Sequence, residues 1–391
     1  MPSALVIGAG PAGLMAAEVM AEAGLTVDIV DQKPSVARKF LMAGKSGLNL
    51  TREQKDSDFL RSYGTSADWL APMIETFGVA EVMAWAEELG QPIFTGSTGR
   101  VFPKAMKASP LLRAWLARLD GLGVTRRVKW RWTGWDGDEA TFETPDGPQS
   151  VAADVFVLAM GGGSWARLGS NGDWARVIGV ATVPFAASNS GVSVTWSEHM
   201  SKHLGSPVKN IALTAGTLTS RGEIVLSRSG IEGGGLYDLT SALRQGGELK
   251  IDLLPDLSEA AVTSRLAKPR GKMSMGTYLR KALKLDPVKV GLLNECARPL
   301  PSNAAELARL VKALPIAIDG LRPLDEAIST VGGVPQAATN PGLMLKDRPG
   351  TFVAGEMLDW DAPTGGYLIT ACLATGAWAG RNATAYAQRY A

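Results

Sequence analysis

Three glycines near the start of the chain have the spacing that allows a peptide backbone to approach a phosphate closely. They belong to the segment Gly8-Ala9-Gly10-Pro11-Ala12-Gly13. In such a segment the first glycine permits a tight turn, the second leaves room for a pyrophosphate, and the third lets a helix pack closely on a strand. The helix that follows offers free N–H groups and the positive end of its dipole to the phosphates. This pattern predicts a dinucleotide-binding site.

The residues on both sides predict the strand, helix and strand that must position these glycines. The apolar run Ala4–Ile7 precedes them, and a helix-like run extends to Gly24. A second apolar run, Leu25–Val30, ends at Asp31. Since an acid at this point of a βαβ unit accepts hydrogen bonds from a ribose, we expect Asp31 to bind the adenosine half of the cofactor.

Three remote segments favour FAD over a nicotinamide cofactor. Asp154–Gly163 and Thr351–Glu356 each read as a strand that ends in small residues, and Ala362–Tyr367 leads into a helix rich in alanine and glycine. A simple nicotinamide-binding domain does not need such late segments, whereas flavoproteins with two dinucleotide-binding domains complete their cofactor site with them. We expect the helix start at Gly365 and Gly366 to stabilise negative charge on the N1–C2=O edge of a reduced flavin.

Together these segments resemble the HI0933-like (BaiN-type) family of NAD(P)/FAD-dependent oxidoreductases, within the flavoproteins that have two dinucleotide-binding domains. The matching stretches follow the family's order and are Val6–Gly13, Ala37–Thr51, Leu158–Gly163, Gly169–Asp173, Val331–Val334 and Ala354–Tyr367. The chain departs from the usual family sequence within Gly44–Asn49 and directly after Tyr367, as a divergent branch would.

The resemblance implies an α/β fold in which a Rossmann-like FAD-binding domain of the glutathione-reductase type is interrupted by two insertions. We expect the FAD-binding domain to comprise residues 1–186 and 326–391. The inserted β-rich domain is expected at residues 187–256 and the small inserted helical domain at residues 257–325.

The motifs and the resemblance together predict the cofactor-binding residues. By the resemblance, Val128 lies beside the adenine, and Lys45 either adds positive charge near the flavin or is solvent-exposed. No residue is identified as a catalytic acid or base, and Tyr367 is a candidate pocket hydroxyl. The full predicted set is Gly8, Gly10, Pro11, Ala12, Gly13, Asp31, Gln32, Lys33, Lys39, Ala43, Gly44, Lys45, Asn49, Val128, Ala159, Gly161, Gly162, Gly355, Glu356, Asp361, Thr364, Gly365, Gly366 and Tyr367.

Composition argues against several other classes of protein. The formal net charge of +2 gives no global field that recruits nucleic acid or an anionic membrane. We find no uninterrupted apolar run long enough for a membrane span, and no basic segment before the first apolar run that would mark a signal peptide. Cys296 and Cys372 are too few for a disulfide framework or a metal cluster, so we expect a cytoplasmic protein.

Two further patterns admit alternatives. His199 and His203 are spaced to share one face of a helix, where a solvated face is favoured over a metal site. Arg126–Trp132 mixes basic and aromatic residues as nucleic-acid surfaces do, but a half-solvated strand is the favoured interpretation. Further along, Val208–Ser220 and Gly222–Leu226 predict a pair of strands, and Ser258–Leu314 predicts helices.

The predicted function is that of an FAD-dependent oxidoreductase acting on a small organic substrate. FAD performs the redox chemistry, and NAD(P)H is the expected electron donor. Because the chain has no second glycine motif of comparable quality, NAD(P)H is expected to dock transiently. One alternative is a flavin oxidase that uses O2 on an amine-type metabolite, and another is an FAD-bound RNA-modifying or RNA-binding protein.

Overall fold

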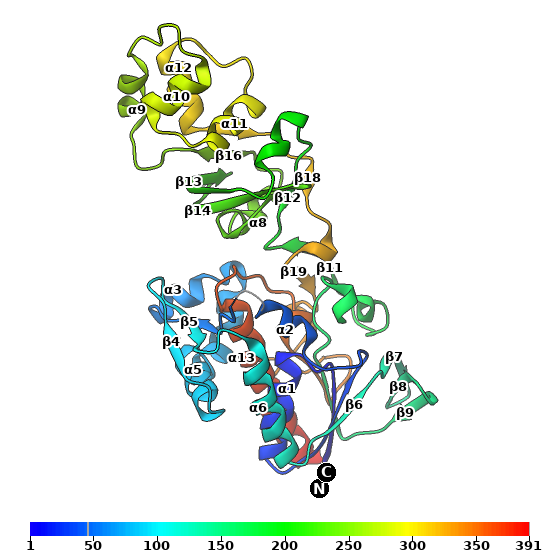
Figure 1. The fold of residues 1–391 in the computed structure, drawn as a ribbon. Helices are drawn as coiled ribbons and strands as arrows, with labels where there is room; N and C mark the ends of the chain where they lie inside the picture. The colour runs from blue at the N-terminus through cyan, green and yellow to red at the C-terminus, as the bar shows by residue number, and fades with distance from the viewer. Residues whose placement is uncertain (45–46, 391) are drawn as a thin grey trace. The chain divides into compact units, whose positions relative to one another are not determined.

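The computed structural model describes residues 1–44 and 47–390, so Lys45 lies outside the described residues. The chain forms two compact units (Figure 1). Unit 1 takes Met1–Ala186 and the chain from Ser329 onward, and unit 2 takes Ala187–Ile328. Among the described residues, no helix is long and apolar enough to cross a membrane.

Unit 1 is built on a parallel five-stranded sheet whose central strand is the first of the chain. Val6 of that strand pairs with Ile29 on one side and with Val157 on the other. The segments Ala4–Ile7 and Val155–Leu158 are apolar and buried throughout, as parallel strands covered on both faces must be. In spatial order they are β20 (Thr351–Val353), β10 (Val155–Leu158), β1 (Ser3–Ile7), β2 (Thr26–Asp31) and β6 (Thr125–Val128).

Two helices from opposite ends of the chain pack together beside this sheet (Figure 1). They are α1 (Pro11–Glu22) and α13 (Tyr367–Tyr390). A Cβ at Gly376 would lie 2.3 Å from the carbonyl oxygen of Ala12, and one at Gly380 would lie 2.8 Å from that of Ala16. The small residues of α13 are therefore required by its close contact with α1. This contact fixes the start of α13 relative to the glycine segment.

The other helices and strands of unit 1 surround this core. The helices are α2 (Arg38–Ala43), α3 (Asp56–Arg61), α4 (Ala67–Thr76), α5 (Val79–Glu88) and α6 (Ala108–Gly121). Two small antiparallel sheets are formed by β3 (Thr51–Arg52), β5 (Arg100–Pro103) and β4 (Ile93–Thr95), and by β7 (Arg131–Asp136), β8 (Glu139–Thr144) and β9 (Gly147–Val151). A two-stranded sheet is formed by β11 (Val183–Ser188) with β19 (Ser329–Gly333).

The basic and aromatic segment at 126–132 is not one alternating strand, so that interpretation is wrong. Lys129 has a φ of +62°, which ends β6 before β7 begins in a different sheet. The backbone N–H of Lys129 donates to the carbonyl of Lys33, and that of Trp130 donates to the carbonyl of Asp31. These bonds turn the chain at the end of β2, which the sequence pattern did not indicate.

Unit 2 contains a seven-stranded sheet and six α-helices within a continuous run of described residues. The strands, in spatial order, are β17 (Leu314–Ile316), β16 (Leu249–Asp252), β13 (Pro207–Ala215), β14 (Leu218–Ser227), β15 (Gly230–Glu232), β12 (Val192–Ser193) and β18 (Gly320–Leu321). The helices are α7 (Gly234–Tyr237), α8 (Thr240–Arg244), α9 (Glu259–Leu266), α10 (Met275–Leu283), α11 (Pro287–Cys296) and α12 (Ala304–Lys312). Sheet and helices share one apolar core.

The predicted strand pair in unit 2 exists, but its turn lies earlier than expected. The turn is at Gly216, whose φ is +56°, so β13 ends at Ala215 and β14 begins at Leu218. Glycine tolerates this left-handed conformation at no steric cost.

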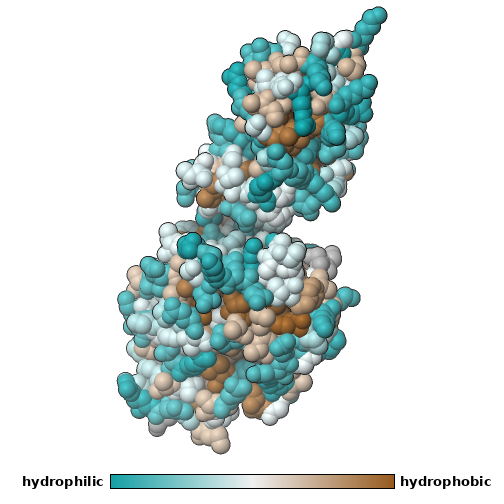
Figure 2. All heavy atoms as spheres, turned by 90° about the vertical axis from the view of Figure 1, so that its left-hand side faces the viewer, coloured by the Kyte–Doolittle hydropathy of each residue, from teal (hydrophilic) through white to brown (hydrophobic). Residues whose placement is uncertain are grey.

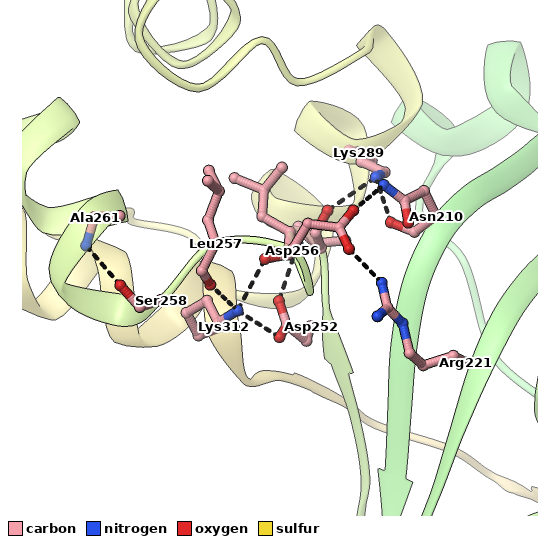
Figure 3. Close-up of polar contacts among 11 residues, drawn as sticks. Asn210, Arg221, Asp252, Asp256, Leu257, Ser258, Ala261, Lys289 and Lys312 are labelled. Atoms are coloured by element: carbon pink, nitrogen blue, oxygen red, sulfur yellow. Dashed lines mark hydrogen bonds and ion pairs between the residues drawn. The ribbon is translucent and has the colours of Figure 1, made fainter.

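Two lysines connect the helices of unit 2 to the loop after β16 (Figure 3). The buried Lys289 donates from Nζ to the carbonyls of Asn210 and Leu253, at 3.1 and 2.8 Å. Lys312 donates to the carbonyls of Leu254 and Leu257 and forms a 2.7 Å ion pair with Asp252. Burial lowers the pKa of Lys289, against the effect of nearby acids. These cations have a structural role within the unit.

Candidate cofactor-binding site

A pocket of about 420 Å³ lies in unit 1 at the carboxyl ends of strands β1, β2, β10 and β20. Ligands bind at this edge of open parallel sheets because the loops and helix starts converge there. Eleven of the predicted residues line the pocket, namely Gly8, Gly10, Pro11, Ala12, Asp31, Gln32, Lys39, Ala159, Gly161, Gly355 and Glu356. Trp130, Trp132 and Trp174, none of which was predicted, also line it.

The three glycines of the N-terminal motif have different surroundings. A Cβ at Gly13 would lie 1.9 Å from the carbonyl oxygen of Gly8, and one at Gly8 would lie 2.3 Å from that of Ala159. At Gly10, by contrast, a Cβ would meet no atom within 4 Å. The backbone before α1 is thus exposed to an open space that fits a pyrophosphate, and the residues present fit a dinucleotide.

Asp31 lies at the end of β2 with both carboxylate oxygens in use. One accepts a hydrogen bond from the N–H of Ala9 at 3.1 Å, and the other accepts from the N–H of Lys33 at 2.8 Å. Burial raises the pKa of Asp31, while these two N–H groups oppose the shift. Each oxygen keeps a lone pair for a further hydrogen bond, and the binding of a ribose by Asp31 stays a prediction.

Replacing Asp31 with alanine is expected to weaken FAD binding by roughly tenfold to a hundredfold. The reason is the loss of hydrogen bonds to a charged group, worth about 1.5–3 kcal/mol. Calorimetric titration of the apoprotein with FAD measures the effect. The matched control is Asp28→Ala on the same strand, since Asp28 pairs with Arg127 and does not line the pocket. Unchanged affinity in the Asp31 variant would refute the ribose role.

Lys39 and Glu356 come together across the pocket from opposite ends of the chain. The Nζ atom of Lys39 lies 2.7 Å from a carboxylate oxygen of Glu356 and 3.0 Å from Oγ of Ser164. Lys39 belongs to α2, and Glu356 follows β20. This ion pair closes one side of the pocket and, with the bond to Ser164, leaves one lysine N–H for a phosphate or a ribityl hydroxyl.

A second group of predicted residues lies at the start of α13 and does not line the pocket. A Cβ at Gly365 would lie 3.7 Å from the ring of Tyr367 and 3.9 Å from Nδ2 of Asn49. The Oδ1 atom of Asn49 is buried and has no hydrogen-bond partner in the described part of the chain. A buried acceptor of this kind normally has a partner. The Asn49 amide and the helix start thus bring polar groups together beside Gly365, and their role at a flavin edge stays a prediction.

Arg100 lies beside this second group of residues, although the sequence did not predict it as a site residue. Its Nε atom lies 3.7 Å from the Cβ position of Gly365, and its side chain forms no ion pair within the described residues. Arg100 begins strand β5, which pairs with β3 next to Asn49. The sequence offered one sign of its role, since Arg100 directly follows Gly99, a glycine that breaks the helical periodicity of the surrounding residues.

The remaining predicted residues lie around these two groups. Gly44, Gly162 and Gly366 are close-packed, since an added Cβ would lie 2.0–2.7 Å from Ala108, Thr330 or Thr51. Val128 is exposed and pairs in register with Asp31 across β2 and β6. Lys33, Ala43, Asp361 and Thr364 do not line the pocket, so their role in cofactor binding stays a prediction.

The histidines and cysteines do not form a metal or redox centre within the described residues. His199 and His203 lie in a 3₁₀-helix, and His203 is buried against Gly291, so the prediction that both face solvent on one α-helical surface is wrong. No group of ligands that could hold a metal ion is found among the described residues. Burial raises the pKa of the Cys296 thiol to about 12 and also raises that of Cys372, which keeps both protonated.

Comparisons with known proteins agree with this geometry. The family model described as "HI0933-like protein Rossmann domain" matches residues 2–382. The 3-dehydro-bile acid delta(4,6)-reductase of Clostridium scindens is 25% identical and aligns over 97% of this chain and 98% of its own. The ribosomal RNA dihydrouridine synthase of Escherichia coli is 22% identical, over 98% and 97% of the two chains.

A solved structure shares the fold over its whole length. It is the 3-ketosteroid delta1-dehydrogenase of Sterolibacterium denitrificans, with a TM-score of 0.51 and 13% identity. The match covers 98% of this chain and 100% of that one. It supports the arrangement of a Rossmann-type sheet and an inserted unit in one polypeptide.

Proposed function

The chain belongs to the HI0933-like family and is an FAD-dependent oxidoreductase, and we propose that it reduces a carbon–carbon double bond conjugated to a carbonyl group. The electron donor in this proposal is NAD(P)H, and the substrate is a small organic molecule. The proposal rests on the polar residues at the start of α13, where Arg100 and the Asn49 amide lie beside Gly365.

The names of the two relatives support the choice of substrate class. One acts on the delta(4,6) double bonds of a 3-dehydro bile acid, and the other forms dihydrouridine. In a 3-oxo steroid and in a uracil ring, the double bond that takes up hydrogen is conjugated with a carbonyl. Conjugation makes the distal carbon electrophilic, so a hydride adds there and a proton adds at the adjacent carbon. The two substrates differ in shape and share this chemistry.

Different residues of this chain would have different roles in such a reaction. FAD, when bound, supplies hydride transfer. Gly10, Asp31 and the Lys39–Glu356 pair would hold its adenosine and phosphate portions in the pocket. At the other end, the Asn49 amide would hydrogen-bond to the pyrimidine edge of the flavin. Arg100 and the dipole of α13 place positive charge where negative charge accumulates on reduction.

Anaerobic reduction tests the donor and the reaction type together. Purified holoenzyme mixed with NADH or NADPH without oxygen is expected to lose the visible absorbance of its oxidised flavin. Addition of 2-cyclohexen-1-one, a simple enone, is then expected to restore it. A flavin that stays oxidised with both donors would favour the oxidase alternative. Protein that remains colourless after incubation with FAD would overturn the cofactor.

Two cysteines bear on the location that we propose. Both are free thiols, and neither has a partner cysteine. This state suits a reducing compartment, and a cytoplasmic location is therefore part of the proposal.

A second candidate function is reduction of a uracil ring within RNA. The relative from Escherichia coli is named for this product and matches almost the whole chain. The specific observation that favours this candidate is the distribution of charge in unit 2.

A further inference from the structure

The near-zero net charge of the whole chain conceals a strongly basic segment. Residues 257–313 contain eleven lysines and arginines and four acids, whereas the chain as a whole has 40 basic and 38 acidic residues. The rest of the chain is therefore net negative. Between Ala260 and Leu285 no acid occurs, and seven basic residues are present, namely Arg265, Lys268, Arg270, Lys272, Arg280, Lys281 and Lys284. Such asymmetry is typical of proteins that bind polyanions.

In the structure these seven residues are exposed and without counter-charges. They lie on the end of α9, the loop that follows it, and α10. None of the seven forms an ion pair with another described residue, and Arg280 bonds only within its own helix, to Gly276 and Thr277. Lys289 and Lys312 of the same unit are instead turned inward onto carbonyl groups (Figure 3). The exposed cations thus do not contribute to the internal polar network.

The basic surface continues into a groove. A groove of about 650 Å³ lies between α10, α11 and the 3₁₀-helix Glu198–His203, and Arg280, Arg298 and Lys202 line it. Its one lining acid is Glu295, and both of that residue's carboxylate oxygens accept hydrogen bonds from Ser197. The groove therefore offers cations to a ligand with little competition from acids.

The chemistry of this surface fits a phosphodiester backbone. Every large apolar side chain within residues 257–313 is buried or half-buried, so the surface offers no anchor for a bilayer. Hydrophilic residues prevail over the face of this unit that Figure 2 shows. Protein interfaces are depleted in lysine and rely on buried apolar anchors, which are absent here. Lysines and arginines free of partners are, in contrast, the groups that contact phosphates.

This basic surface fits structured RNA better than duplex DNA. The helices α9, α10 and α11 have eight, nine and ten residues, and three of the seven cations lie on the loop between α9 and α10. Short helices and a basic loop present no long helix to a DNA major groove. They match the shape and backbone contacts by which structured RNA is recognised.

We propose that Arg265–Lys284, with the adjoining groove, is a docking surface for structured RNA. The proposal rests on the second candidate function for its biological purpose. RNA binding itself is measured without turnover, so its failure and that of the redox proposal are distinguishable.

The test is binding of a fluorescein-labelled RNA hairpin to the holoenzyme, followed by anisotropy over a range of salt concentrations. The variant Lys268→Glu, Arg270→Glu and Lys272→Glu changes only exposed loop residues. It is expected to lower affinity at least tenfold. The slope of log affinity against log salt is expected to fall by roughly two to three units, at about 0.7–0.9 per lost phosphate contact.

The matched control reverses three exposed basic residues of unit 1, Lys55, Arg381 and Arg389, which also form no ion pair with a described residue. Its affinity is expected to stay within about twofold of the wild type. The reduction of flavin by NAD(P)H should be unchanged in both variants. No RNA binding by the wild type, equal loss in both variants, or binding to phosphatidylserine vesicles without binding to RNA would each overturn the proposal.

Discussion

The variant Gly10→Val is expected to fold and to lose FAD. Its Cβ enters the open space before α1, where no protein atom lies within 4 Å, so the apoprotein should be destabilised by about 1 kcal/mol or less. The valine then occupies the volume that the pyrophosphate needs. We expect affinity for FAD to fall at least a hundredfold, which corresponds to about 2.7 kcal/mol. This loss of affinity is measured in two ways, by the flavin content of the purified protein and by calorimetric titration of the apoprotein with FAD.

Two other glycines serve as controls for this prediction. Gly121 at the end of α6 also has no atom near its Cβ position and lies outside the pocket, so Gly121→Val should keep both fold and cofactor. At Gly13 the added Cβ would lie 1.9 Å from a carbonyl oxygen, so Gly13→Val should reduce the free energy of unfolding itself. A Gly10→Val protein that keeps wild-type flavin content would show that the pyrophosphate does not lie there.

The variant Arg100→Gln is expected to keep FAD but to slow reduction of the substrate by roughly tenfold to a hundredfold. Removal of one group that stabilises developing negative charge has an effect on this order, and the exposure of Arg100 places it toward the lower end. The reduction potential of the bound flavin is expected to fall, because positive charge beside its pyrimidine edge favours the reduced ring. Spectroelectrochemical titration and anaerobic stopped-flow measurements give the two quantities.

A structural role for Arg100 would leave the potential unchanged, so this readout separates the two explanations. Arg100→Lys keeps the charge and should restore most of the potential, but less of the rate, because lysine lacks the planar guanidinium. Arg113→Gln is the matched control, since Arg113 is an exposed arginine of α6 outside both residue groups. If Arg100→Gln and Arg113→Gln behave alike, Arg100 does not act on the flavin.

Whether the charge of this protein favours RNA binding depends on the length of chain over which the charge is counted. The whole-chain charge of +2 argued against nucleic acid. Counted over residues 257–313 alone, the balance is strongly basic, and the cations are exposed. Since salt screens charges beyond about 8–10 Å, the local density governs binding to a phosphate backbone. The division of unit 2 at residue 256 stays a prediction, because sheet and helices share one core.

The sequence by itself determined the parts of this protein that are specified by local rules. Glycine spacing and the acid at Asp31 predicted the first βαβ unit, whose strands, helix and turn each depend on neighbouring residues. The order of the later strand segments, together with the family resemblance, predicted their return to the cofactor-binding domain, and β10 indeed pairs with β1 while β20 pairs with β10.

Only the tertiary structure decided which distant side chains meet. The ion pair of Lys39 with Glu356 and the approach of Arg100 to Gly365 depend on the close packing of α13 on α1, which brings the two ends of the chain together. The bend at Lys129 and the burial of His203 likewise follow from contacts far along the chain. Local pattern carries no information on such contacts, because packing across the core selects them.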